Sequence, residues 1–313
     1  MSGRDRIAIL LAVTIAAIAV LVGVRTGLEE VDVDEIVYHD TLVAMRGGEG
    51  YYDAMRDALV EKEGAPPSSV RAVRPPTMFL MLRWLPESSW RYVVGLVYLA
   101  ILLLAFLIGR PYGRFGGVIA VGLAGFWVLA AAPFLFVHAE LWGLPFFLGA
   151  VLAARKERQG TSAMLLLGAT LTRELYGTGL LVGALVFRRR LPWLGTSIAA
   201  VVAAIGHGLL ARSILAAQGT EAALGNEPRT IIKILTIISP GDRPLSWVIG
   251  TVVLVVGLTA LIQRWHADQA AKLLLPFVLI MIPASIIATR TYWGLTFGPA
   301  LAAFVPAVRA PRR

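Results

Sequence analysis

The segment from Leu28 to Pro76 reads LEEVDVDEIVYHDTLVAMRGGEGYYDAMRDALVEKEGAPPSSVRAVRPP and is the first long polar stretch after an apolar beginning. Most of the chain's 20 acidic residues lie in it or next to it. Those between Arg25 and Glu87 are Glu29, Glu30, Asp32, Asp34, Glu35, Asp40, Glu49, Asp53, Asp57, Glu61, Glu63 and Glu87. Because the rest of the chain is mostly apolar, we expect any reactive carboxylate to lie in this segment.

The composition indicates a membrane protein. Of the 313 residues, 57% are hydrophobic and 16% are charged, whereas about 25% of the residues in soluble domains are charged. Apolar runs of roughly 18 residues, long enough to cross a hydrocarbon core of about 30 Å, recur along the chain. The chain has no cysteine, which excludes disulfides and a thiol nucleophile. The net charge of +9 fits arginines at the cytoplasmic ends of spans, so we expect no nucleic-acid partner.

These runs predict an all-α polytopic protein with about ten transmembrane helices in a single domain, 1–313. The expected spans are 7–24, 92–108, 116–137, 141–154, 162–171, 175–187, 194–210, 247–262, 273–288 and 292–307. Both termini then lie in the cytoplasm, every loop on that side is basic, and 26–88 and 211–245 are external loops. The short apolar stretch 77–86 is expected at the membrane interface.

The segment 162–187 can be divided in two ways. Its apolar parts are interrupted by Arg173 and Glu174, which predicts two short helices that meet at a charged pair on the outer side. Alternatively, 162–187 is one long span. That alternative inverts the rest of the chain and puts Arg188, Arg189 and Arg190 outside, against the positive-inside rule.

Charged side chains near the predicted outer ends of spans are the main indication of a site. A charge inside the membrane costs at least about 2.5–3.5 kcal/mol, so such groups usually face a cavity or a partner. Together with Arg74 and the acidic loop, they could line one outward-facing cavity suited to a phosphate and a sugar. The alternative is an internal salt bridge of Arg173 with Glu140 or Glu174. The groups are His138 with Glu140, Arg173 with Glu174, His207 with Arg212, and Arg290 with Tyr292 and Trp293.

The first loop has its own helical pattern. Residues 38–46 are expected to form a helix that ends at Gly47-Gly48, and the next helix begins at Gly50-Tyr51-Tyr52. The second helix carries Ala54, Met55, Ala58 and Leu59 on one face, at helical spacing. This pattern predicts a helix that lies along the membrane surface on its apolar side.

The chain resembles the GT-C superfamily of polytopic glycosyltransferases, which includes protein O-mannosyltransferases, aminoarabinose transferases and actinobacterial lipid mannosyltransferases. The resemblance rests on one N-terminal span, an external loop with an acidic residue, the segment GEGYYDAM (48–55), and Arg74-Pro75-Pro76 before the next span. The paired short helices and the charges at the outer span ends also match. The topological likeness covers most of the chain, and the first loop is its most specific part.

The resemblance implies a GT-C-like core and an inverting glycosyltransferase. The donor would be a polyprenyl-phosphate-linked sugar, and the acceptor a hydroxyl on a glycolipid, glycan or protein at the outer face of a bacterial plasma membrane. Carried over by position, Asp40 is the catalytic base, and Arg74, Arg173 and Arg290 bind the donor phosphate. Sugar or acceptor would be bound by His138, Glu140, Glu174 and Tyr292. No cofactor and no metal is expected.

Two features of the first loop leave other interpretations open, and so do two other classes of function. The family's first loop often has two adjacent acids, whereas Asp40 lies between His39 and Thr41, so Asp34, Glu35 and Asp53 are alternative bases. Asp32-Val33-Asp34 matches the D-x-D metal motif, but such a match is expected by chance in so acidic a loop. Two other classes of function remain: a lipid or solute transporter, and a non-catalytic membrane subunit whose acidic loop binds a partner.

Overall fold

The computed structural model describes residues 7, 9–18, 33–63, 73–113, 115–131, 139–214, 244–288 and 296–309. Within these ranges the chain forms α-helices, short 3-10 helices and turns, and no strand. The prediction of an all-α fold is confirmed.

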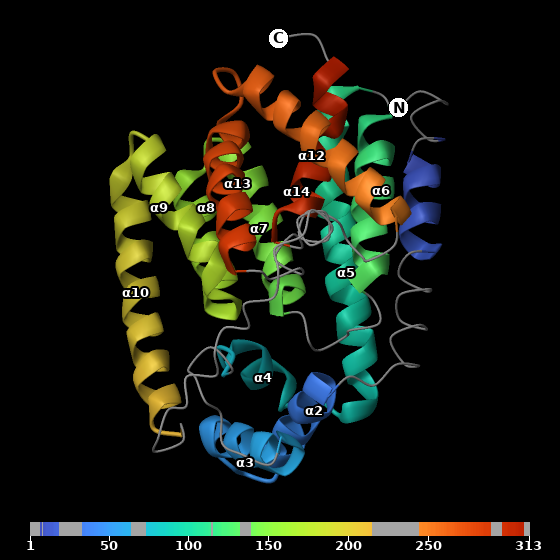
Figure 1. Cartoon of the computed structure of the whole chain (residues 1–313). Coiled ribbons are helices and arrows are strands. Elements are labelled where there is room, and N and C mark those ends of the chain that lie inside the picture. The colour runs from blue at the N-terminus through green and yellow to red at the C-terminus, as the bar shows by residue number, and fades with distance from the viewer. Residues whose placement is uncertain are drawn as a thin grey trace.

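A bundle of helices carries a layer of three helices at one end (Figure 1). The layer consists of α2 (Val33–Arg46), α3 (Tyr51–Glu63) and α4 (Thr77–Leu82). The bundle helices are α5 (Glu87–Gly109), α6 (Gly116–Ala131), α7 (Ala139–Arg155), α8 (Gln159–Thr172), α9 (Gly177–Val186), α10 (Arg190–Arg212), α12 (Pro244–Arg264), α13 (Gln269–Ala288) and α14 (Gly298–Phe304). Three 3-10 helices, η2 (Arg110–Tyr112), η3 (Glu174–Tyr176) and η5 (Val305–Arg309), follow α5, precede α9 and follow α14.

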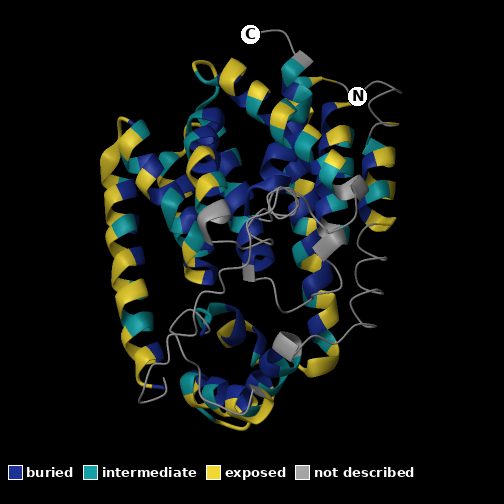
Figure 2. Cartoon of the chain, in the orientation of Figure 1, coloured by how far each residue is buried: buried dark blue, intermediate teal, exposed yellow. Residues whose placement is uncertain are grey.

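Within the described residues, three helices are long and apolar enough to cross a membrane. They are Glu87–Tyr112, Arg190–Arg212 and Trp247–Arg264. The 23 residues of α5 extend about 34 Å at 1.5 Å per residue, enough for a hydrocarbon core. Only 11% of the most apolar 18-residue segment of α10 is buried in the protein. Most of this helix is exposed along one side of the bundle (Figure 2), and its exposed residues include Leu191, Ile198 and Val202. An apolar surface of this size indicates a membrane protein.

The remaining predicted spans that fall in the described part coincide with shorter helices. Helices α6, α7, α8, α9 and α13 occupy the predicted segments 116–137, 141–154, 162–171, 175–187 and 273–288, with ends that differ by several residues. The expected short interfacial stretch 77–86 contains α4. Most of the expected second external loop, 211–245, lies outside the described residues.

The chain reverses direction between α8 and α9, as expected for two short helices. Gly179 packs so closely on Leu166 that an added β-carbon would lie 2.7 Å from a methyl carbon of that leucine. A β-carbon added to Gly177 would likewise lie 3.2 Å from the methyl carbon of Thr170. In one continuous helix residues 13 positions apart would lie about 20 Å apart. The alternative of one long helix over 162–187 is therefore wrong.

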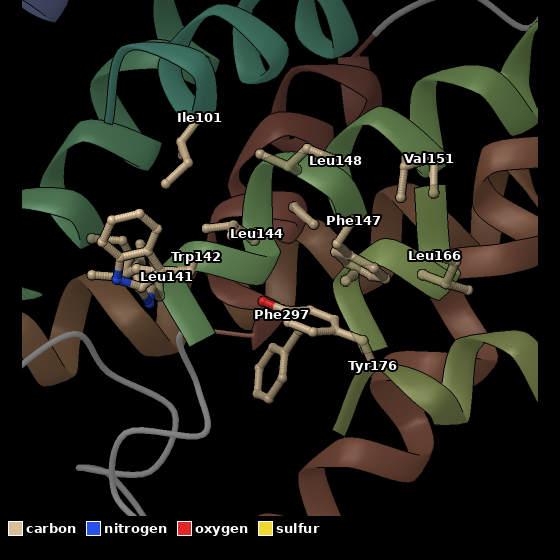
Figure 3. Packing of buried hydrophobic residues seen from close by; sticks show 14 of the residues in the cluster. Ile101, Leu141, Trp142, Leu144, Phe147, Leu148, Val151, Leu166, Tyr176 and Phe297 are labelled. Atoms are coloured by element: carbon tan, nitrogen blue, oxygen red, sulfur yellow. The ribbon is translucent and has the colours of Figure 1, made fainter. Parts of the chain in front are cut away.

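An aromatic cluster at the centre of the bundle connects α7, η3 and α13. The ring of Phe147 lies 4.6 Å from that of Phe277 and 5.2 Å from that of Tyr176, measured between centroids. Figure 3 shows Phe147 and Tyr176 among the buried aliphatic side chains that surround them. Close packing of such large side chains holds helices together in a membrane, where the hydrophobic effect does not drive one helix onto another. The cluster supports the backbone that carries Glu140 and Arg173.

The two helices predicted in the first loop are present, with two corrections. Helix α2 begins at Val33, five residues before the expected start, and ends before Gly48, which has φ 102°. Ala54, Met55, Ala58 and Leu59 of α3 are buried within the protein, and α3 packs on α2. The hydroxyl of Thr41 on α2 contacts the sulfur of Met55 at 3.8 Å. The apolar face of α3 therefore covers α2 and does not lie open toward a bilayer.

Candidate functional site

The helical layer is held together around Arg74 by tyrosine side chains. The Nε of Arg74 donates to the hydroxyl of Tyr38 on α2 at 3.0 Å, and the hydroxyl of Tyr51 on α3 donates to the carbonyl of Arg74 at 2.6 Å. Both tyrosine rings pack on Phe79 of α4, with centroids 5.3 and 5.0 Å away. Burial raises the pKa of Tyr51 well above its usual value, so this hydroxyl stays a donor. Arg74 is thus fixed between α2, α3 and α4.

Three further hydrogen bonds attach the layer to the bundle. The hydroxyl of Thr77 donates to the carbonyl of Leu171 in α8 at 2.5 Å. His207 of α10 lies 2.9 Å through Nδ1 from the hydroxyl of Tyr52 and 3.2 Å through Nε2 from the carbonyl of Val73. Because a carbonyl only accepts, Nε2 carries the proton and Nδ1 accepts from the tyrosine. The first loop is docked on the ends of α8 and α10.

A buried charge cluster lies where α8 ends. Arg173 leaves the helix in an extended conformation, with φ −151° and ψ 115°. Its Nε donates to Glu140 at 2.7 Å, and its Nη1 donates to Glu174 at 3.0 Å. Only 4% of the Arg173 side chain and 2% of the Glu140 side chain are exposed, whereas Glu174 is 55% exposed. The internal salt bridge considered from the sequence is therefore present, and it involves both carboxylates.

Neighbouring side chains hold this cluster in place. The hydroxyl of Tyr176 donates to the backbone carbonyl of Glu140 at 2.8 Å. Gly143, one turn along α7, lies against the ring of Tyr176, so that an added β-carbon would be 2.4 Å from Cε2. The charge cluster thus packs on the aromatic cluster through Tyr176, and this packing limits how far the charged side chains can rearrange.

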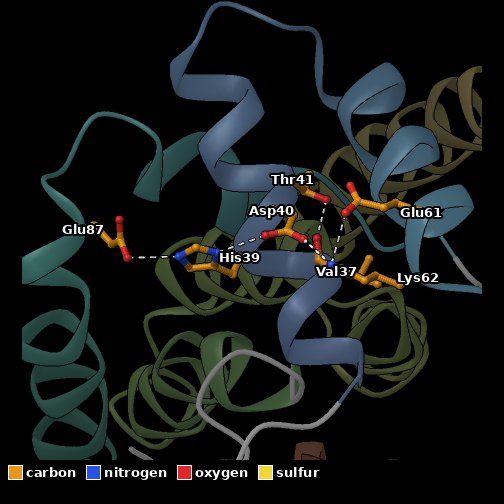
Figure 4. A network of polar contacts seen from close by, with 7 residues as sticks. All are labelled: Val37, His39, Asp40, Thr41, Glu61, Lys62 and Glu87. Atoms are coloured by element: carbon orange, nitrogen blue, oxygen red, sulfur yellow. Dashed lines mark hydrogen bonds and ion pairs between the residues drawn. The ribbon is translucent and has the colours of Figure 1, made fainter.

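Asp40 belongs to a second network, which joins α2, α3 and the start of α5 (Figure 4). Its carboxylate lies 3.2 Å from Nδ1 of His39 and 3.4 Å from the amine of Lys62. Nε2 of His39 lies 3.0 Å from Glu87. With 34% of its side chain exposed, Asp40 is both held by cations and open to solvent.

The contacts of His39 in this network favour its charged form. Partial burial lowers the pKa of its imidazole, but hydrogen bonds and charges of Glu87 and Asp40 outweigh that effect and raise the pKa above the ordinary 6.5. A doubly protonated ring can donate to both carboxylates at once. His39 therefore bridges α2 to α5 most strongly in its charged form.

The structure brings some of the predicted residues together and keeps others apart. Arg173, Glu140 and Glu174 are in direct contact. Thr77 follows Arg74 by three positions, and Leu171 precedes Arg173 by two. The hydrogen bond between Thr77 and Leu171 therefore brings the chain around Arg74 next to the chain around Arg173. Asp40 is two positions after Tyr38, the residue that meets Arg74. Two positions correspond to about 200° around a helix, so Asp40 and Tyr38 lie on nearly opposite sides of α2.

Several predicted residues lie outside the described part of the chain: His138, Arg290 and Tyr292, and the side chains of Asp34 and Glu35. The third alternative base, Asp53, pairs with Arg56 on its own helix at 3.1 Å and is 60% exposed.

Sequence reasoning missed the partners that hold Asp40 and the loop. Lys62 follows Met55 by seven positions, so the helical period puts the two on one face of α3, and burial of Met55 against α2 brings Lys62 to Asp40. Glu87 lies 48 positions from His39, and no local pattern predicts that pair. Tyr52 was recognised only as part of a motif, although it binds His207.

The arrangement combines an accessible carboxylate, on the side of α2 away from Arg74, with arginines at and beneath the surface on which the loop is docked. Such groups can accept a proton and stabilise an anion, respectively. Comparisons with protein-family models, curated protein sequences and solved structures gave no match to this chain.

Proposed function

We propose that the protein is an inverting glycosyltransferase that moves a sugar from a polyprenyl-phosphate donor to an acceptor hydroxyl at the outer face of a membrane. The observation that carries the proposal is the docking of the carboxylate-bearing loop on the helix end where Arg173 is buried between Glu140 and Glu174. A charge cluster at a helix break in a membrane protein is costly, and such clusters usually serve a function.

The proposal includes a topology finer than the three long helices. The shorter apolar helices α6, α7, α8, α9, α13 and α14 with η5 also cross or enter the membrane, giving about ten spans around a GT-C-like core. Both termini are cytoplasmic, and the layer of α2, α3 and α4 is external. Pairing between the short helices supports this, because α7 packs on α8 and α9 packs on α13 within the bundle.

In this reaction Asp40 removes the proton from the acceptor hydroxyl while the hydroxyl oxygen attacks the anomeric carbon of the donor sugar. The bond between that carbon and the phosphate oxygen breaks with inversion, and the polyprenyl phosphate leaves with the electron pair. His39 and Lys62 hold the carboxylate in a fixed orientation, which favours an in-line approach of the hydroxyl.

The leaving phosphate requires cations, and Arg74, Arg173 and Arg290 are proposed to provide them. Arg173 is bound by two carboxylates, of which only Glu174 is largely exposed. An incoming phosphate would therefore displace Glu174 from Nη1, while Glu140 remains on Nε. Released in this way, Glu174 can accept hydrogen bonds from sugar hydroxyls, a role proposed also for His138, Glu140 and Tyr292.

The experiment is an assay of the purified protein in liposomes with polyprenyl-phosphate mannose or polyprenyl-phosphate arabinose and a mixture of short glycan acceptors. The expected result is release of polyprenyl phosphate together with a new glycosidic bond of inverted configuration. Movement of intact donor between leaflets without cleavage of its sugar would instead show a transporter and contradict the proposal.

A further inference from the structure

A pocket of about 400 Å³ lies between the end of α5 with η2 and the end of α7. Figure 1 shows that these helix ends lie at the opposite end of the bundle from the layer of α2, α3 and α4. The pocket is therefore remote from the site described above, and its role does not depend on the proposed function. It is lined by Leu107, Arg110, Pro111, Leu152, Arg155 and Lys156.

One wall of the pocket is rigid. Arg155 donates through Nε to Asp268 at 3.1 Å, through Nη1 to the carbonyl of Ile108 at 2.6 Å, and through Nη2 to the hydroxyl of Tyr112 at 2.5 Å. The guanidinium also lies 5.0 Å from the ring centre of Phe304. These contacts tie α5, α7 and the chain before α13 together, and Arg155 covers a carbonyl at the end of α5 that would otherwise repel an anion.

The other cations of the pocket supply its attraction for an anion. Asp268 offsets the charge of Arg155, whereas Arg110 and Lys156 are exposed at the mouth. Arg110 follows directly on the apolar helix α5, which puts it at the level of lipid headgroups. The exposed Glu157 comes next after Lys156, and Arg158 follows it, so the rim keeps a net positive charge.

The apolar part of the lining identifies the ligand more closely. Leu107 and Leu152 face the pocket together with Pro111, and these side chains offer no partner to a free, fully hydrated ion. A molecule with a phosphate at one end and hydrocarbon at the other satisfies both halves of the pocket. Basic pockets between transmembrane helices bind anionic lipid headgroups by this combination.

We propose that this pocket binds an anionic phospholipid of the leaflet opposite the loop layer, with Arg110 and Lys156 on its phosphate and Leu107 and Leu152 on its glycerol and first acyl carbons. Inorganic phosphate has the same anionic chemistry without the hydrocarbon, so the two sources can be separated by experiment.

Native mass spectrometry of the purified protein tests the proposal with phosphatidylglycerol, phosphatidylcholine and inorganic phosphate as probes. Wild-type protein should bind phosphatidylglycerol roughly tenfold more tightly than phosphatidylcholine, since each cation near an anionic headgroup adds several-fold in affinity and the choline ammonium offsets the phosphate charge of phosphatidylcholine. The Arg110→Gln/Lys156→Gln variant should lose this preference. The matched control, Arg83→Gln/Arg91→Gln, removes two cations near the loop layer and should keep it.

Retention of the preference in Arg110→Gln/Lys156→Gln would overturn the proposal, as would displacement of phosphatidylglycerol by equimolar inorganic phosphate, which would show a free-anion site. A second measurement needs no variant. Phosphatidylglycerol with a photoreactive headgroup should cross-link wild-type protein at the peptides that contain Arg110 or Lys156. Cross-links confined to other peptides would equally refute it.

Discussion

The Nε of Arg173 lies 2.7 Å from a carboxylate oxygen of Glu140, although 33 positions separate the two residues and both side chains are almost completely buried. A buried pair gains little over an apolar pair of the same size, because both charges lose their hydration. Removal of one partner is different, since it leaves the other charge buried and unpaired. The pair therefore constrains the break between α8 and η3 more than it adds to overall stability.

Replacement of one member of this pair should be costly. We expect Glu140→Ala to lower the free energy of unfolding by about 3–5 kcal/mol, because among the described residues Arg173 then keeps only the largely exposed Glu174 as a carboxylate partner. The double variant Glu140→Leu/Arg173→Met should recover most of that loss. Thermal unfolding in detergent measures both, and Glu174→Gln is the control, with an expected change below about 0.5 kcal/mol. A double variant less stable than Glu140→Ala would contradict this account.

Gly143 is needed for the close approach of α7 to Tyr176. In Gly143→Ala the new methyl would lie 2.4 Å from the tyrosine ring and 2.7 Å from the hydroxyl of Thr172, next to Arg173. Overpacking of this kind costs about 1–3 kcal/mol. The control is Gly122→Ala in α6, where nothing lies within 4 Å of the added carbon and helix propensity favours alanine. Equal melting temperatures for the two variants would show that α7 can move away.

The attachment of α2 to α5 should weaken as the pH rises. His39 has a raised pKa in the folded protein, so it binds its proton more tightly there than in the unfolded chain. Its contribution is fully present below the ordinary pKa of 6.5 and is lost as the pH rises through the higher folded value. Hydrogen exchange of α2 should accelerate between about pH 6 and 8 in wild-type protein, beyond the intrinsic chemical increase.

His39→Gln separates this effect from other titrations. The glutamine variant should show the faster exchange at both ends of that pH range, with no additional dependence on pH. If wild-type protein and His39→Gln exchange alike at pH 6, the His39–Glu87 contact contributes nothing to docking.

The chain's lack of cysteine permits a clean test of topology. Ser88 at the start of α5 and Arg158 before α8 are exposed, and the proposed topology puts them on opposite sides of the membrane. In intact cells a membrane-impermeant maleimide should label Ser88→Cys and should label Arg158→Cys only after permeabilisation. The reverse pattern would mean that the loop layer faces the cytoplasm.

Local patterns in the sequence predicted the helices and their breaks. Gly47-Gly48 ends α2 because the second glycine adopts a positive φ. Arg173 and Glu174 separate two short apolar segments, because charged side chains are costly inside an apolar span. The same charges, read together with Glu140, left two interpretations open, a cavity for a ligand and an internal salt bridge, and the structure contains the salt bridge.

Tertiary pairings in the loop could not be predicted in this way. The contacts of Asp40 with Lys62, of His39 with Glu87 and of Tyr52 with His207 join segments 22, 48 and 155 positions apart. A loop rich in acids offers many equally plausible partners for each cation, and only the packing of α2 on α3 and on α5 selects among them. The sequence also does not show what covers an apolar helix face. The apolar face of α3 therefore predicted contact with the membrane surface, whereas it packs on α2.

The proposed sugar transfer requires Asp40 as its base, and the Asp40→Asn variant removes that base. The amide keeps the shape of the side chain and cannot take up the acceptor's proton at neutral pH. Asp57→Asn, an exposed carboxylate on α3 that pairs with Arg56, is the matched control. Initial rates of transfer from polyprenyl-phosphate mannose or arabinose should fall at least about a hundredfold in Asp40→Asn, with donor binding unchanged, and stay near wild type in Asp57→Asn. Full transfer activity in purified Asp40→Asn protein would contradict the account.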